Sequence, residues 1–365
     1  MITIIGAGPI GNYLAYLLSK NKKQVQVFEE HKDIGLPVQC TGITTSKLDE
    51  IINLNKDIVI NKINKARIYA PNKKFIEIHF QKPNLIINRN KFDNHLADLA
   101  KKQGAKFYTN HKFIKAENNK AIIKNKNNNQ IKEIQFNQII GADGPLSRVA
   151  KSITKKQNKV WQGIQARVTL KNNNIIEFYP FFGTYAWIVP ENKNIVRLGL
   201  VGDTKYTNIL FKNFLKFKEI KSNQILEYQG GLIPKYNPQI KTQKKQKNST
   251  IYIVGDAATQ VKATTGGGII QGLLAARSLT DSIIKKKNYQ KQWKNAIGKE
   301  LYLHLKARNI LDKFKDKDWN KLINIMNEEK CKKILATIDR DHIYSMIIKL
   351  IIKKPSLLRF TKYIF

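Results

Sequence analysis

Three glycines near the N-terminus have the spacing of a phosphate-binding turn. Gly6, Gly8 and Gly11 form the pattern GxGxxG between an apolar run and an amphipathic segment, which predicts a strand, a tight turn and a helix. Glycines let the backbone approach a pyrophosphate, and a helix N-terminus offers N–H groups and a positive dipole. Glu29 ends the next predicted strand, where a carboxylate can bind a ribose, although Glu30 could take this place. This region predicts a dinucleotide site.

A second cluster decides between the two dinucleotides considered, NAD and FAD. The segment IYIVGDAA (251–258) predicts a buried strand that ends at Asp256, and three glycines (266–268) open a further helix at Ile269. An aspartate at this point can bond the ribityl and phosphate region of an extended cofactor. The helix N-terminus can face the flavin atoms that gain negative charge on reduction. The Gly-Asp pair at the end of this strand favours an FAD site, and it argues against an ordinary glycine loop before a core helix.

A cysteine lies in a loop rich in glycine and proline, DIGLPVQCTGI (33–43), just after the second predicted strand. Cys40 is one of only two cysteines in the chain. Its thiol could contact the cofactor or take part in catalysis, or it could be a small buried filler. The segment GADG (141–144) places Asp143 at another strand end, where it either reaches the cofactor or orders the turn.

Composition limits the class of protein. The chain has 365 residues, a hydrophobic content of 42% and no apolar run near the ~18 residues of a membrane span. Two distant cysteines and no recognisable signal peptide predict a cytoplasmic protein, either free or peripheral to a membrane. No metal site is expected. The net charge of +38 fits either an anionic membrane surface or a general enrichment in lysine. Basic and aromatic residues are not interleaved, which argues against nucleic acid.

The order of elements predicts an α/β fold with a discontinuous first domain. Residues 1–155 and 245–287 are expected to form it, with a β-hairpin insertion near 65–88. Residues 156–244 predict a β-rich domain, and 288–365 predict a basic helical tail. The end of this tail alternates apolar clusters with lysines, so it could lie on an anionic lipid surface or pack against the protein.

Several motifs together carry a resemblance to a known family. GxGxxG with its glutamate, GADGPLSR and VGDAATQVKATTGGGI resemble the flavoprotein monooxygenase-like superfamily. IGLPVQCTGI and GTYAWIVP resemble the geranylgeranyl reductase family of archaea and plants. The resemblance covers roughly residues 1–310 and implies a Rossmann-like FAD-binding domain of the GR2 type with an inserted antiparallel-sheet substrate domain. It implies reduction of C=C bonds in geranylgeranyl chains of archaeal ether lipids or their precursors, with NAD(P)H or ferredoxin as the electron donor.

The resemblance also implies roles for particular residues. Cys40 becomes the candidate catalytic residue, and Arg89, at the start of a predicted helix, either meets a phosphate or is a surface residue. A strand near Phe113 would offer backbone contacts to the adenine. The full set of expected FAD neighbours, from the motifs and the resemblance together, is Gly6, Gly8, Gly11, Glu29, Gln39, Cys40, Gly42, Arg89, Phe113, Asp143, Asp256, Gly266, Gly267, Gly268 and Ile269.

The segment FGTYAWIVP (182–190) is the expected substrate-lining strand. Tyr185 and Trp187 alternate onto one face of a strand, where they would line an apolar tunnel or serve as ordinary core aromatics. The family pattern Pro-x-x-Tyr-x-Trp-x-Phe-Pro has Phe182 and Val189 here in place of its first proline and its phenylalanine. These changes affect the expected substrate and chain length more than the reaction.

The proton donor and the reaction class stay open at this level. A thiol of pKa about 8.5 is a poor acid toward an unactivated alkene, so Cys40 could position the substrate or order a water. Many relatives have a carboxylate just after this cysteine, whereas Thr41 and Gly42 follow it here. The alternatives are a flavin-dependent monooxygenase or halogenase of the same fold, and a non-catalytic flavin- or lipid-binding protein.

Overall fold

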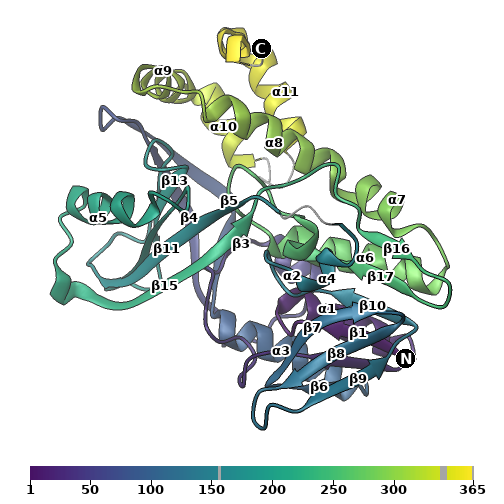
Figure 1. Cartoon of the computed structure of the whole chain (residues 1–365). Coiled ribbons are helices and arrows are strands. Elements are labelled where there is room, and N and C mark those ends of the chain that lie inside the picture. The colour runs from purple at the N-terminus through teal and green to yellow at the C-terminus, as the bar shows by residue number, and fades with distance from the viewer. Residues whose placement is uncertain (155–157, 338–342, 364–365) are drawn as a thin grey trace.

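The structure is a computed structural model that describes residues 1–154, 158–337 and 343–363. It has one six-stranded sheet, one eight-stranded sheet, a small three-stranded sheet and a run of helices toward the C-terminal end (Figure 1). The α/β fold class is confirmed. The predicted boundary between residues 155 and 156 and the last two residues of the predicted tail lie outside the described residues.

The six-stranded sheet has the order β16–β17–β10–β1–β2–β6. Every neighbouring pair is parallel except β16 and β17. Its central strands are buried at nearly every position and rich in Ile and Val, as expected for a parallel sheet covered on both faces. The strands are β1 (Ile2–Ile5), β2 (Val25–Phe28), β6 (Lys106–Tyr108), β10 (Gln138–Gly141), β16 (Gln243–Lys245) and β17 (Thr250–Ile253). The two segments expected to share a domain therefore contribute to one sheet.

Helices and the small sheet bury this parallel sheet in one large core. Helix α1 packs against both α3 and α6. The three-stranded sheet contributes Phe113, Ala121 and Ile123 to the same core. The elements are α1 (Pro9–Lys20), α2 (Lys47–Ile51), α3 (Arg89–Lys102), α4 (Arg148–Lys151), α6 (Ile269–Ile284), β7 (His111–Glu117), β8 (Lys120–Asn125) and β9 (Ile131–Gln135).

The eight-stranded sheet has the order β15–β11–β14–β13–β12–β4–β5–β3, with a single parallel pair, β12 and β4. One face is covered by α5 (Thr207–Phe217), and the other faces the segments around Gln39 and Gly266. Ala186 and Ile188 point toward α5, whereas Tyr185, Trp187 and Val189 belong to the core on the opposite face. The strands are β3 (Ile43–Thr45), β4 (Val59–Tyr69), β5 (Phe75–Ile87), β11 (Val160–Thr169), β12 (Ile176–Tyr179), β13 (Tyr185–Pro190), β14 (Ile195–Gly202) and β15 (Ile225–Pro234).

The β-hairpin near 65–88 differs from its expected place. The sequence analysis predicts it as an insertion in the discontinuous first domain. In the structure β4 pairs with β12 through Ala66 and Ile176, so the hairpin extends the eight-stranded sheet. Alternating side chains predict a strand and its faces but not the sheet whose edge it joins, which depends on a contact more than 100 residues away.

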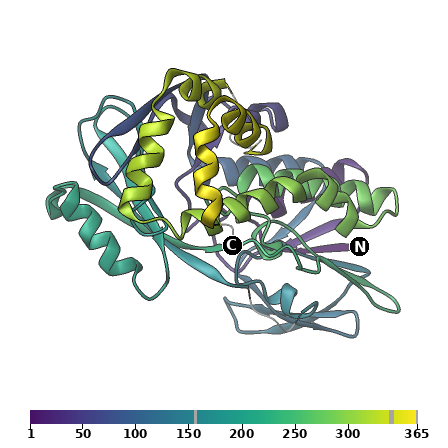
Figure 2. The same ribbon diagram turned by 90° about the horizontal axis from the view of Figure 1, so that it is seen from above.

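The helices after β17 run from the six-stranded sheet to the hairpin β4–β5 (Figures 1 and 2). Helix α7 packs on α6, and α9 and α10 pack on β5. Cys331 is fully buried in this core, which fits a structural role. The helices are α7 (Tyr289–Trp293), a π-helical turn (Lys294–Gly298), α8 (Lys299–Leu311), α9 (Asp316–Met326), α10 (Glu329–Thr337), α11 (Ile343–Lys353) and a 3₁₀ segment (Pro355–Tyr363). Of the helices described, none is long and apolar enough to span a bilayer.

Candidate functional site: a cavity between two sheets

A cavity of about 1090 Å³ lies where the two large sheets meet. Its walls come from the glycine turn after β1, the Cys40 loop, the glycine triplet before α6, and strand β13. Every predicted site residue lines this cavity except Gly11 and Gly42. Folding thus brings together predicted site residues as far apart in the sequence as Gly6 and Ile269.

The glycine turn combines tight packing with an open approach from the cavity. An added Cβ at Gly11 would lie 2.0 Å from the carbonyl oxygen of Gly6, and one at Gly6 would lie 2.4 Å from that of Ala142. Gly6 also has a φ of +101°, which favours glycine. At Gly8, the N-cap of α1, an added Cβ would meet no atom within 4 Å. The start of α1 therefore offers an open cradle that fits the pyrophosphate of a dinucleotide.

Glu29 lies at the end of β2 beside this cradle. Its carboxylate accepts hydrogen bonds from the backbone N–H of Ala7 at 2.7 Å and of His31 at 3.0 Å. Glu30 instead pairs with Lys112 at 3.2 Å and is nearly half exposed. Of the two neighbouring glutamates, Glu29 is therefore the one that the glycine turn holds in place, which supports it as the ribose-binding residue.

Asp143 orders the turn in which it lies. Its carboxylate accepts hydrogen bonds from the Ser147 hydroxyl at 2.5 Å and from the backbone N–H groups of Arg148 and Val149 at 2.7 and 3.2 Å. Burial raises the pKa of this carboxyl, and the hydrogen bonds oppose that rise. Of the two roles considered for Asp143, the structure shows the ordering of the turn.

Asp256 and the glycine triplet meet strand β13 across the cavity. Burial raises the pKa of Asp256 to about 6, while the charge of Arg89 acts in the opposite direction. An added Cβ at Gly268 would lie 3.0 Å from Oδ1 of Asp256. At Gly266, whose φ is +64°, it would lie 2.4 Å from the hydroxyl of Tyr185. Only glycine permits this close approach of the triplet to both side chains.

Cys40 lies among charged and polar groups in the cavity wall. Its sulfur accepts a hydrogen bond from the backbone N–H of Gly42 at 3.3 Å. Burial lowers the pKa of the Arg89 guanidinium, but the neighbouring Asp93 and Cys40 outweigh burial and raise it. Burial also raises the pKa of the Tyr185 hydroxyl; Arg308 opposes this rise and Cys40 adds to it. The loop thus places the thiol near Arg89 and Tyr185.

Arg89 has a partner that the sequence interpretation missed. Its Nε and Nη2 donate to the two carboxylate oxygens of Asp93 at 3.1 and 2.9 Å. Asp93 lines the same cavity. The signal was available, because an arginine and an aspartate four positions apart on a predicted helix face one another. Arg89 is therefore neither a surface residue nor an isolated cation.

The end of the cavity away from the glycine turns is apolar. Ala66, Ile68, Ile78, Phe80 and Phe178 line it, together with Leu335 and Met346 from the C-terminal helices. Tyr185 and Trp187 stand between this end and the glycine triplet, with ring centroids 5.8 Å apart. Gly199 on the neighbouring strand makes room, since an added Cβ would lie 2.5 Å from Trp187 Cζ2. Within the described residues, no group of three or more His, Cys, Asp or Glu could hold a metal ion.

Comparison with known proteins defines the class. Residues 1–181 match the family model described as FAD binding domain. With the parallel sheet and the glycine cradle, this match identifies an FAD-binding domain in the chain. Together with full-length relatives that are named as reductases, it identifies the chain as an FAD-dependent oxidoreductase. Gly6, Gly8, Glu29 and Asp256 line the cavity of this domain.

Similarity over the full length points to particular relatives. The chain is 28% identical to the digeranylgeranylglycerophospholipid reductase of Methanococcus vannielii, over 99% of this chain and 97% of the relative. The same coverage and identity hold for the enzyme of that name from Methanocaldococcus jannaschii. The resemblance to the geranylgeranyl reductase family is confirmed.

Solved structures agree on the fold. A geranylgeranyl bacteriochlorophyll reductase-like protein from Thermoplasma acidophilum superposes with a TM-score of 0.81 at 21% identity, covering 100% of this chain and 98% of the other. A flavin-dependent halogenase, CmlS, superposes with a TM-score of 0.68 at 13% identity, covering 98% and 77%. The expected GR2-type fold is confirmed, and halogenases share it.

Proposed function

We propose that this protein is an FAD-dependent reductase that saturates C=C bonds of geranylgeranyl chains in isoprenoid ether lipids or their precursors. The observation that carries the proposal is one continuous cavity, with a dinucleotide cradle at one end and apolar side chains at the other. Cys40, Tyr185 and Trp187 line the stretch between them. The relatives named as digeranylgeranylglycerophospholipid reductases support the substrate class.

Reduction of an isolated alkene requires a hydride at one carbon and a proton at the other. Reduced FAD supplies the hydride when it is bound. Trp187 and the apolar side chains around it hold the chain and exclude water, while Cys40, fixed in its loop, delivers the proton or orders the water that does. The electrons come from NAD(P)H or ferredoxin.

The test is anaerobic and uses dithionite, which replaces the natural electron donor. FAD-loaded protein is incubated with a phospholipid that carries geranylgeranyl chains, and the lipid mass is followed. We expect mass gains in steps of two hydrogens, and a loss of at least about 100-fold in rate in Cys40→Ala with FAD binding retained. The control Cys331→Ala should keep the rate, provided that it folds.

Two outcomes would contradict the proposal. Bound, reducible FAD without any gain in lipid mass, together with oxygen-dependent NAD(P)H turnover, would favour the monooxygenase or halogenase alternative. Bound FAD with no turnover in either assay would favour the non-catalytic flavin- or lipid-binding alternative.

We further propose that α11 contacts an anionic membrane surface. Tyr344, Ile348 and Ile352 recur every four residues and are exposed, so they form an apolar stripe on one side of this helix. Lys349 and Lys353 are exposed beside the stripe. Met346 of the same helix lines the apolar end of the cavity. An amphipathic helix of this composition at this place fits the entry of a long lipid chain.

A further inference from the structure

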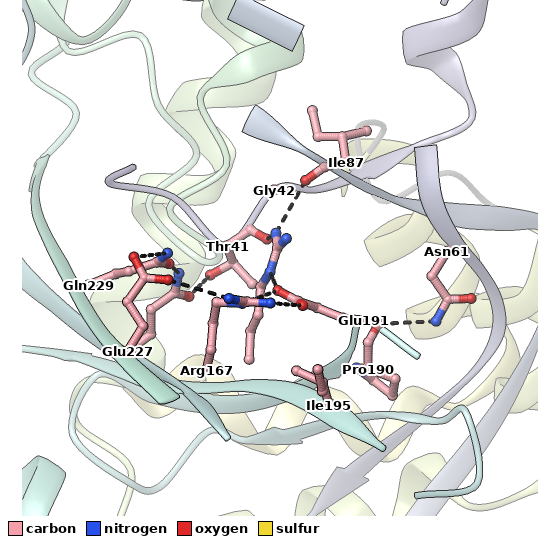
Figure 3. A network of polar contacts seen from close by, with 12 residues as sticks. Thr41, Gly42, Asn61, Ile87, Arg167, Pro190, Glu191, Ile195, Glu227 and Gln229 are labelled. Atoms are coloured by element: carbon pink, nitrogen blue, oxygen red, sulfur yellow. Dashed lines mark hydrogen bonds and ion pairs between the residues drawn. The ribbon is translucent and has the colours of Figure 1, made fainter. Parts of the chain in front are cut away.

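A network of buried charges connects the eight-stranded sheet to the Cys40 loop (Figure 3). Glu191 lies just after β13 and accepts hydrogen bonds from Nε of Arg197 at 2.7 Å and from Nε of Arg167 at 2.9 Å. Arg197 and Glu191 are both buried, whereas Arg167 is about one-third exposed. Burial raises the pKa of Glu191, but the bonds and charges of the two arginines lower it below its ordinary value.

Arg197 uses a second guanidinium nitrogen to hold two backbone segments. Its Nη1 donates to the carbonyl oxygen of Thr41, the residue after Cys40, and to that of Ile87 at 3.2 Å. Ile87 ends β5, immediately before the helix that carries Arg89. One guanidinium therefore ties the cysteine loop and the base of α3 to the same carboxylate.

The loop has a second attachment through the Thr41 side chain. Its hydroxyl donates to Oε1 of Gln165 at 2.8 Å, and Nε2 of Gln165 donates to Gln229 at 2.6 Å. Both attachments begin on strands of the eight-stranded sheet and end on Thr41 (Figure 3). Thr41 is thus held by its backbone and by its side chain.

Gly42 is explained by the same network. It does not line the cavity. Its φ is +73°, and an added Cβ would lie 2.8 Å from Nη1 of Arg197 and 2.6 Å from the carbonyl oxygen of Ile87. The glycine that the family resemblance suggested as an FAD neighbour is therefore needed for close approach to Arg197.

We propose that Arg197, oriented by Glu191, is the positioning residue that fixes the Cys40 thiol in the cavity. The inference deepens the proposed function and rests on it for its catalytic consequence only. A reacting group must stay within a fraction of an ångström of its partner, so a loosened loop lowers the rate of the chemical step more than it weakens binding.

The test compares Arg197→Met with the matched control Arg167→Met. Both remove one guanidinium from Glu191, but only Arg197 touches the loop. In FAD-loaded protein, alkylation of Cys40 by N-ethylmaleimide is timed by peptide mass mapping, with the buried Cys331 as an internal reference. We expect Cys40 to react at least about fivefold faster in Arg197→Met and within about twofold of the unmodified chain in Arg167→Met.

The kinetic arm uses Arg197→Met and the conservative variant Arg197→Lys. Arg197→Met should lower kcat for lipid reduction by about tenfold with a smaller change in KM, and Arg197→Lys should recover part of that loss. Equal labelling rates in Arg197→Met and Arg167→Met would overturn the proposal. The labelling arm needs no substrate, so failure of the lipid assignment leaves it intact. If Arg197→Met does not fold, Arg197→Lys carries the same comparison.

Discussion

Asp256 and Glu191 are both carboxyls in or beside the cavity, yet their environments shift their pKa values in opposite directions. Asp256 is desolvated, and its pKa rises to about 6. Glu191 is held by two arginines, and its pKa falls below the ordinary range. The difference follows from the number of donors that each carboxylate finds, since burial alone disfavours the charged form in both.

Asp256 should make the apoprotein less stable as the pH rises. The folded state binds this proton more tightly than the unfolded state, so its contribution to stability is complete below about pH 4 and is lost as the pH rises through about 6. Asp256→Asn removes this dependence. The unmodified chain therefore loses stability relative to Asp256→Asn as the pH rises. We expect the free energy of unfolding of the variant, minus that of the unmodified chain, to increase by about 1–3 kcal/mol from pH 4 to pH 7. Urea unfolding at several pH values checks this, and a constant difference would contradict it.

Glu191 should have the opposite pH dependence and a large effect when removed. Its stabilisation is present above pH 4.5 and is lost as the pH falls, because protonation breaks the pairs with Arg197 and Arg167. Glu191→Gln leaves a buried guanidinium without its counter-charge and should lower the free energy of unfolding by about 3 kcal/mol. Thermal unfolding of this variant beside Glu227→Gln, which removes a half-exposed partner of Arg167, separates the buried pair from the surface pair.

At the scale of elements, the glycines of the turn between β1 and α1 serve two purposes: one is needed for folding and another for ligand binding. Gly11 packs against the backbone of Gly6, whereas Gly8 faces the open cavity. Two glycines of one motif therefore have different physical reasons to be glycine. The first allows the helix to approach the strand, and the second allows a ligand to approach the helix.

Substitution by alanine should distinguish the two positions. Gly11→Ala places a Cβ 2.0 Å from a backbone oxygen and should lower the free energy of unfolding of the apoprotein by at least about 2 kcal/mol. Gly8→Ala should leave that stability within about 0.5 kcal/mol and weaken FAD binding by at least about tenfold. Calorimetry of the apoprotein and fluorescence titration with FAD measure both. Equal effects of the two variants on stability would contradict this division.

At the scale of the whole molecule, the net charge of +38 attracts any anionic surface, so binding to vesicles alone shows little. The position of the apolar stripe on α11 is specific, because Met346 of that helix lines the cavity. The question is therefore which face of the molecule meets the lipid.

Two isoleucine-to-glutamate variants answer it, since both make the same change in charge. Ile352 lies on α11 and is 68% exposed, and Ile131 lies on β9 and is 66% exposed. Ile352→Glu should weaken binding to vesicles of phosphatidylglycerol by about tenfold, whereas Ile131→Glu should stay within about twofold. Co-sedimentation at fixed ionic strength measures both. Equal losses would mean that charge alone, without a docking face, drives the binding.

The sequence by itself determined the parts of this protein that depend on local spacing. GxGxxG with Glu29, the strand ending at Asp256, the glycine triplet and the Tyr185-x-Trp187 alternation each follow from the backbone geometry of a few consecutive residues. The cofactor and the fold class could be predicted from them, because a phosphate cradle requires glycines at set intervals.

Tertiary structure alone decided what depends on contacts between distant segments. It joined the β4–β5 hairpin to the eight-stranded sheet and placed the Arg197 guanidinium on the carbonyl of Thr41, 156 residues away. Only Asp93 left a local signal, its spacing of four from Arg89. An arginine or a lysine in a lysine-rich sequence has no periodicity that marks it as buried. The role of such a residue emerges only when packing removes it from water and brings it against particular partners.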